Sequence, residues 1–345
     1  MTELVLKAAS PPDVISQHWT LQREDNSLEA LSVSLLIPKD WLKYEPYKAP
    51  ASADGLDLVL FGRYGDRDGK ALVEVYAQKI LRELSSADWF EHFARERGYR
   101  VEKRHLEYSP AGMNVDAIAT KAGKDGAPFV YRMTTFKDAD RVYLVSGFAH
   151  PKDYEAFSET FVVAANSFRL NHGPKGWSGE PLRPTRLTRV QPIEFMIPQT
   201  WRRESEPGDP SAEVERIAFQ NLGGQRVLGQ LTVATAKSRS YASHEAFLEA
   251  LTHGIKGTPT VTLAPFGEGT PSWSADAQQG VAPFLKEEGK DKRTLRVVVG
   301  RADGGWVGLA LVMHHTSGDP YPADAINNRA FEIVLQTIAP ASSAS

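Results

Sequence analysis

The chain has 345 residues, of which 41% are hydrophobic and 24% charged, and its formal net charge is −3. This composition is that of an ordinary globular protein, and the length suggests two domains. The sequence contains no cysteine, which excludes disulfides, thiolate nucleophiles and cysteine-ligated zinc. Charges of both signs are scattered along the chain, so no basic face for nucleic acid is predicted.

The amino-terminal segment predicts neither export nor insertion into a membrane. It reads MTELVLKAASPPDV, with the acidic Glu3 and without the apolar core of a secretory signal. No apolar run in the chain approaches the ~18–20 residues that a spanning helix needs. The lack of cysteine also fits a reducing compartment. We therefore expect a cytoplasmic protein with no stable membrane insertion.

The first strand that the sequence predicts clearly contains Val73, Val75 and Ala77 on one face. Tyr76 and Gln78 point to the opposite face, because side chains alternate along a strand. We predict that the face with the valines lies under the helices of the domain. The face with Tyr76 and Gln78 is then the more open one.

A helix is predicted to follow, beginning at Ser85 and ending at Gly98. Ser85 and Asp88 have the spacing of a capping box, with aspartate in place of glutamate. A hairpin and a closing helix complete this half of the chain, at 129–136, 141–148 and 153–168.

The second half of the chain repeats this pattern. Residues 35–41 read LLIPKDW and residues 195–201 read FMIPQTW, and ALVEV at 71–75 is matched by GQLTV at 229–233. The remaining elements are expected in the same order, with a helix capped by Ser243, a hairpin at 294–299 and 306–313, and a helix at 323–338. Two unrelated domains would not be expected to share this order, so the sequence predicts two copies of one domain.

The predicted fold class is α+β, with two tandem α/β/α domains, each an antiparallel sheet flanked by helices. The first domain is expected at 1–170 and the second at 188–341, joined by a linker rich in glycine and proline at 171–187. Residues 342–345 are predicted to be a disordered tail.

The hairpin strands are apolar on both faces, a pattern typical of strands that are buried on both sides. Helices can cover one of these faces. The other face must be covered by long side chains of the domain, by the sister domain or by a partner.

No catalytic signature is present: the sequence has no phosphate-binding loop, dinucleotide fingerprint, nucleophile elbow or HExxH motif. The stretch from Asp66 to Gly69 predicts a hairpin turn rather than a calcium loop, because the glutamate that such a loop needs downstream is missing. His314, His315 and Asp319 are a weak candidate for a metal site, since neighbouring residues on a strand point to opposite faces. Glu74 is expected to pair with Arg132 across the sheet.

Two copies of the motif Ile-Pro-x-x-Trp, at 37–41 and 197–201, and the segment at 166–170 that reads NSFRL carry a family resemblance. Together with the helix that contains Trp89 and Phe90, they resemble the PsbP-like α/β/α sandwich superfamily. This superfamily includes DcrB-related bacterial proteins and the Ran-binding nuclear-import factors. The second copy departs from the pattern at its end, where residues 335–338 read LQTI.

The resemblance implies a binding protein that is not an enzyme and has no cofactor. Within the superfamily the chain is most similar to Eag-type chaperones of type VI secretion, in which paired domains hold apolar amino-terminal helices of secreted effectors. The function it implies is a cytoplasmic adaptor or chaperone with a protein partner. The chain would be a monomer with pseudo-dimeric domains or a weak homodimer.

The candidate partner-binding residues lie on the central strands and the hairpins, and each of them fits ordinary core packing equally well. They are Tyr76, Gln78, Met133, Phe148, Leu309 and Leu311. Two other functions stay open: a small-molecule or lipid-binding module with a pocket between sheet and helices, and an enzyme with an unrecognised site.

Overall fold

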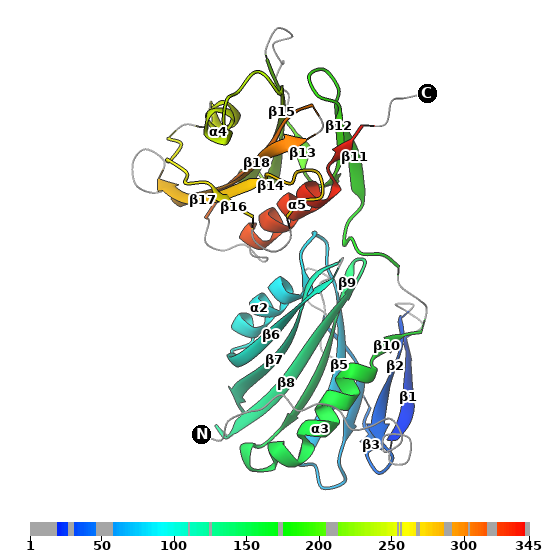
Figure 1. Ribbon diagram of the computed structural model, residues 1–345. Coiled ribbons are helices and arrows are strands. Elements are labelled where there is room, and N and C mark those ends of the chain that lie inside the picture. Colours follow the sequence, from blue (N-terminus) through cyan, green and yellow to red (C-terminus); the bar gives the residue numbers. More distant parts are fainter. Residues whose placement is uncertain are drawn as a thin grey trace. The chain divides into compact units, whose positions relative to one another are not determined.

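A computed structural model gives the fold of the chain (Figure 1). It describes residues 19–26, 31–45, 58–109, 111–123, 126–171, 175–204, 213–253, 255, 257–266, 270–285, 292–302, 304–315 and 323–341. The predicted tail at 342–345 and Asp319 lie outside the described residues. The chain forms two compact units, Met1–Gly179 and Glu180–Ser345, and each is described by itself.

The first unit has a small sheet, a large sheet and two helices. The small sheet has the order β1-β2-β10, formed by Trp19–Asn26, Leu31–Pro38 and Arg169–Leu170. The large sheet has the order β3-β4-β5-β9-β8-β7-β6, formed by Leu42–Lys43, Val59–Gly65, Ala71–Lys79, Arg141–Ala149, Pro128–Asp138, Gly112–Ala122 and Arg100–Ser109. Helix α2 is Ser86–Glu96 and helix α3 is Pro151–Ser167.

The second unit has the same elements in the same order. Its small sheet has the order β11-β12-β20, formed by Leu182–Leu187, Ile193–Pro198 and Ala339–Pro340. Its large sheet has the order β13-β14-β15-β19-β18-β17-β16, formed by Arg202–Arg203, Val214–Gly223, Arg226–Lys237, Gly305–His314, Lys292–Ala302, Gln278–Leu285 and Ala264–Pro265. Helix α4 is His244–Thr252 and helix α5 is Ala323–Thr337.

All strand pairs are antiparallel, and helices accompany each large sheet, so the fold is α+β as predicted. The matching strand orders of the two units agree with the internal repeat in the sequence. No helix among the described residues is long and apolar enough to span a membrane.

One face of the large sheet in the first unit packs against helix α3 and the small sheet. Val73 and Val75 on this face are fully buried, as is Leu35 of the small sheet. Gly147 lets α3 approach closely, because a Cβ atom there would collide with the ring of Phe161. The prediction that the valine face lies under a helix is confirmed.

The local signals of the sequence also agree with the structure. Ser85 caps α2 by accepting a hydrogen bond from the backbone N–H of Asp88, and Ser243 caps α4 in the same way. The turn that begins at Asp66 joins β4 to β5, and Asp66 Oδ1 accepts a hydrogen bond from the backbone N–H of Ala71.

The segment predicted as a linker is only partly free of regular structure. Its last six residues form β11, which pairs with β12. Upstream of it, Asp138 Oδ1 accepts hydrogen bonds from the backbone N–H groups of Lys175 and Gly176. Part of this glycine- and proline-rich segment therefore forms a paired strand, although its composition predicted irregular structure.

The predicted pair of Glu74 with Arg132 is wrong. Glu74 lies opposite Ser146, whereas Arg132 lies opposite Gly147, so the two side chains point to opposite faces. Arg132 binds Asp116 instead, with 3.1 Å between Nε and Oδ1.

Candidate partner-binding face of the first unit

The second face of the large sheet in the first unit carries helix α2 and a row of aromatic side chains. We call this row the aromatic face; it consists of Tyr76, Tyr99, Phe129, Tyr131 and Phe148. All five side chains are half-buried. The face is built by β5, β8, β9 and the residue that precedes β6 (Figure 1).

Four of these five rings, those of Tyr99, Tyr131, Phe148 and Phe129, contact one another in a row. Tyr131 stacks on Phe148 with 4.9 Å between ring centroids, and Phe148 meets Phe129 edge-on at 5.9 Å. Tyr99 is edge-on to Tyr131 at 5.0 Å. Such offset and edge-to-face arrangements are the favourable geometries of aromatic pairs. The face is therefore a preformed aromatic surface rather than a set of isolated rings.

Strand register explains why these side chains share a face. Tyr131 lies directly opposite Phe148, and Phe148 lies opposite Leu72 on the next strand. Residues that lie opposite each other in an antiparallel pair point to the same side of the sheet. Tyr76 and Phe129 are an even number of residues from Leu72 and Tyr131 on their strands, so they point the same way.

A charged group lies within this face. The Glu74 carboxylate accepts a hydrogen bond of 2.6 Å from the Tyr76 hydroxyl and lies 3.2 Å from Arg63 Nε. Its side chain is 13% exposed. Burial raises the pKa of Glu74, while the Tyr76 hydrogen bond and the Arg63 charge oppose part of this rise.

The charge of Glu74 helps to raise the pKa of three tyrosines, Tyr76, Tyr99 and Tyr131. Burial, together with that charge, raises the pKa of Tyr131 to about 12. Burial is likewise the first cause that holds the pKa of Tyr76 and of Tyr99 above its usual value, and the charge of Glu74 adds to it. Glu74 therefore contacts the Tyr76 hydroxyl directly and acts on Tyr99 and Tyr131 through its charge.

Four of the six predicted partner-binding residues lie on this side of the sheet. Tyr76 and Phe148 belong to the aromatic face. Gln78 is half-buried beside them, and its Oε1 accepts a hydrogen bond of 2.9 Å from Trp89 Nε1 of helix α2. Met133 points to the same side but is completely buried, so it cannot itself contact a partner.

Leu309 and Leu311 require a correction. Both are completely buried in the core of the second unit, opposite Val233 and Leu231, on the side that packs against helix α5. The sequence could not assign their direction, because both faces of β19 are apolar and buried. They are core residues in this structure, which is the alternative that the sequence left open.

Sequence reasoning missed Tyr99, Phe129 and Tyr131, and it gave Glu74 the wrong partner. Phe129 and Tyr131 have the same parity as Met133 on one strand, so alternation from Met133 would have found them. Tyr99 follows the end of a helix, where no periodic pattern continues.

The same face of the second unit is covered by its own chain. Strand register, taken from the matching hairpin turns, places Leu295 at the position of Tyr131, Val312 at that of Phe148 and Ala234 at that of Tyr76. All three are buried. They belong to a core that includes Phe247 and Leu251 of helix α4.

Residues that follow α4 add a second layer to this cover. Ile255, Val261 and Leu263 pack on the same core. Val261 and Thr262 come so close to Gly280 of β17 that a Cβ atom there would collide with both. Register places Ala117 of the first unit at the position of Gly280, and there the chain passes from α2 through Gly98 directly into β6.

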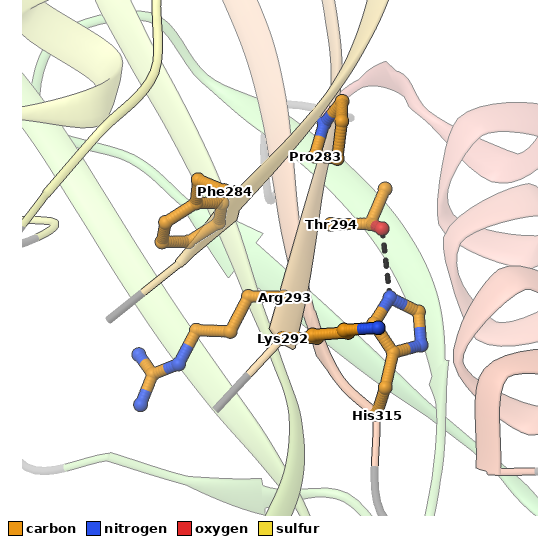
Figure 2. A pocket seen from close by; sticks show the side chains of 6 residues that line it. All are labelled: Pro283, Phe284, Lys292, Arg293, Thr294 and His315. Atoms are coloured by element: carbon orange, nitrogen blue, oxygen red, sulfur yellow. Dashed lines mark hydrogen bonds between the residues drawn. The ribbon is translucent and has the colours of Figure 1, made fainter. Parts of the chain in front are cut away.

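The second unit also has a pocket of about 400 Å³ at the ends of β17 and β18 (Figure 2). It is lined by Pro283, Phe284, Lys292, Arg293, Thr294 and His315. It lies at the end of the sheet, not in the space between sheet and helices where the small-molecule alternative expects one.

His315 links three elements beside this pocket. One ring nitrogen, Nε2, lies 2.8 Å from the Thr294 hydroxyl, and the other, Nδ1, lies 2.8 Å from Asp324 Oδ2. The side chains of His315 and Asp324 are 36% and 44% exposed. Within the described part of the chain, no group of three metal-ligating side chains lies together.

Comparisons with known proteins complete the description of the chain. No family model and no curated protein matches it. The solution structure of cyanobacterial PsbP (CyanoP) from Synechocystis sp. PCC 6803 is similar at 12% identity, with a TM-score of 0.32, over 44% of this chain and 92% of that one. The apo structure of the T6SS immunity protein TplEi from Pseudomonas aeruginosa is similar at 10% identity, with a TM-score of 0.24, over 94% and 98%. A Tle4–Tli4 complex is similar at 9% identity, with a TM-score of 0.24, over 95% and 99%, and at such values the likenesses carry no inference about what this chain binds.

Proposed function

We propose that the chain is a binding protein without enzymatic activity, and that the aromatic face of its first unit holds an extended apolar segment of a protein partner. One observation carries this proposal. The second unit covers the equivalent face with an extended piece of its own chain, around Val261 and Leu263, and the first unit has no such piece after α2.

The chemistry of the face supports a protein partner. Tyrosine and phenylalanine give a large contact area with few rotatable bonds, and they are enriched at interfaces and among the residues that contribute most to binding. The face also offers polar groups, Glu74 and the tyrosine hydroxyls, beside its apolar rings. A segment that is apolar with a few polar groups would find complementary partners there.

The finer form of the proposal names the partner. The partner is an effector secreted by a type VI system, and its apolar segment must be shielded from water until the effector is exported. The chain is then a cytoplasmic adaptor or chaperone that shields this segment with its aromatic face. It would hold its client by contacts and carry out no reaction on it.

Co-purification tests the proposal. The full chain is co-expressed with a type VI effector that carries an apolar amino-terminal segment, and the amount of retained effector is compared with that of the double variant Tyr131→Ala, Phe148→Ala. We expect the double variant to retain at least tenfold less effector, because loss of central aromatic contacts typically weakens binding by about 2 kcal/mol or more.

The matched control is Val281→Ala, which removes an exposed apolar side chain from the sheet of the second unit. This variant should retain as much effector as the unchanged chain. The proposal fails if the unchanged chain purifies alone, or if the double variant retains its partner in full.

A further inference from the structure

The aromatic face has a feature that a purely apolar segment would not satisfy. Glu74, beside Tyr76 on β5, is a carboxylate whose side chain is 13% exposed. A segment laid over the face would remove the remaining water from this charge, which is unfavourable unless a partner group compensates it. The bound segment is therefore expected to bring a group that compensates the charge of Glu74.

The groups around Glu74 are suited to a cation. Arg63 contacts it from β4 and Tyr76 from its own strand. Tyr99 and Tyr131, whose rings meet edge-on at 5.0 Å, lie near enough that its charge helps to raise the pKa of both hydroxyls. Aromatic rings attract cations through the negative potential of their faces, and a carboxylate adds direct charge attraction. Lys121, whose Nζ lies 4.6 Å from the centroid of the Tyr99 ring, already shows this type of contact at the border of the cluster.

We infer that Glu74, Tyr76, Tyr99 and Tyr131 together form a site for an ammonium group, carried by a lysine side chain of the bound segment. This inference rests on the proposed function and names the chemistry that the segment must present. An ammonium group fits better than a second guanidinium, because it is compact and ends a flexible apolar stem that can lie along Phe148 and Leu72.

Arg63 is the competing cation within the protein. Its Nε lies 3.2 Å from Glu74 Oε1, whereas Oε2 accepts the hydrogen bond of Tyr76. The Arg63 side chain is 34% exposed, so it lies toward the border of the face. An incoming ammonium group would share the carboxylate with Arg63 or displace it, and removal of Arg63 should strengthen binding of the incoming cation.

The second unit lacks this site. Thr232 stands at the position of Glu74, Ala234 at that of Tyr76 and Leu295 at that of Tyr131. The second unit covers its face with apolar side chains of its own, and none of these three positions carries a carboxylate. The carboxylate and the tyrosines thus occur together on the face that no described segment after α2 covers.

Methyl NMR of the full chain tests the inference without the partner. The chain has five methionines, and labelling of their methyl groups gives few, resolved signals. Met133 lies in the same row of the sheet as Ser146 and Glu74 and points to the same face. The probe is n-butylammonium, and n-butanol is the control probe, which has the same stem without the charge.

We expect n-butylammonium to shift the Met133 signal in a saturable manner, while Met196 and Met313 of the second unit stay unchanged. Glu74→Gln should weaken this binding about tenfold, Arg63→Met should strengthen it, and Asp68→Asn, at an exposed turn, should leave it unchanged. The affinity of the probe should fall as the pH is lowered through the pKa of Glu74, because the protonated carboxyl no longer attracts a cation.

Two results would overturn the inference. One is an equal shift of Met133 with n-butanol, and the other is a Glu74→Gln variant that binds n-butylammonium as well as the unchanged chain. Either result would leave the proposed function standing if the double variant Tyr131→Ala, Phe148→Ala still loses the effector. Retention of the effector by that double variant would end the proposed function itself, whatever the probe does.

Discussion

The two units use the chain that follows their first helix in different ways. In the first unit, Gly98 and Tyr99 lead straight into β6, a strand of 10 residues at the edge of the sheet. In the second unit the same edge is held by β16, which has 2 residues, and the residues before it pack on the sheet face instead. After its first helix, one unit therefore extends its sheet, whereas the other shortens its sheet and covers the face with the residues before β16.

Single residues explain why a segment of the chain can cover the sheet face in the second unit. A segment can lie across the second sheet because Gly280 has no side chain to block it, and Ala117 fills the matching position in the first unit. The side chains under the segment, Leu295 and Val312, are aliphatic and fully or almost fully buried. Their counterparts, Tyr131 and Phe148, carry larger rings that tolerate partial exposure to water. The same fold thus gives a closed core in one unit and a contact surface in the other.

The largest expected effect is on the closed core of the second unit. Phe247→Ala removes a completely buried ring that packs on Trp306, and it should destabilise the second unit by about 3–5 kcal/mol. Hydrogen exchange of β15 and β19, measured by mass spectrometry on the full chain, reports the loss for this unit alone.

The matched variant in the first unit is Phe148→Ala. Because Phe148 is only half-buried, we expect a loss of about 1 kcal/mol in the protection of β8 and β9. The contrast between a closed and an open face would be contradicted by equal losses in the two units.

A second prediction concerns the segment that covers the second unit. Gly280→Val places a branched side chain where Val261 and Thr262 lie, so it should push this segment off the sheet. We expect a loss of about 1–3 kcal/mol and increased binding of the dye ANS, which reports exposed apolar surface.

Val281→Ala is the control for this variant, since Val281 is the neighbouring residue and is 61% exposed. It should change stability by less than about 0.5 kcal/mol and leave dye binding as it is. If Gly280→Val bound no more dye than this control, the segment would not be the cover of the face.

The sequence predicted the local features of both units well. The caps at Ser85 and Ser243, the hairpin turns and the closing helices depend on residues that are close together in the chain. The alternation around Val75 likewise identified the buried side of β5, because only one side of that strand is uniformly apolar.

The candidate site was less accessible to sequence reasoning, for physical reasons. Strand β6 reads RVEKRHLEYS, and its alternation is hidden because nearly every side chain at this sheet edge is exposed. The direction of Leu309 and Leu311 could not be assigned because β19 is apolar on both faces. The cover around Val261 belongs to an irregular segment, and no periodic pattern tells which part of a sheet such a segment crosses.

The smallest expected effect tests what the two units have in common. Ser85→Ala and Ser243→Ala each remove the side-chain cap of the helix that packs beside the face under comparison, and each should destabilise its own unit by about 1 kcal/mol. The loss should be somewhat greater for Ser85, whose hydroxyl also donates a hydrogen bond of 2.6 Å to Asp88 Oδ2. Exchange rates of the first-turn amides in α2 and α4 measure both effects in one chain. The Ser243 cap is a local contact with the backbone of Ala246. Displacing the covering segment with Gly280→Val should therefore leave the effect of Ser243→Ala unchanged. A strong coupling between these two substitutions would show that the segment around Val261 holds α4 in place as well as covering the sheet.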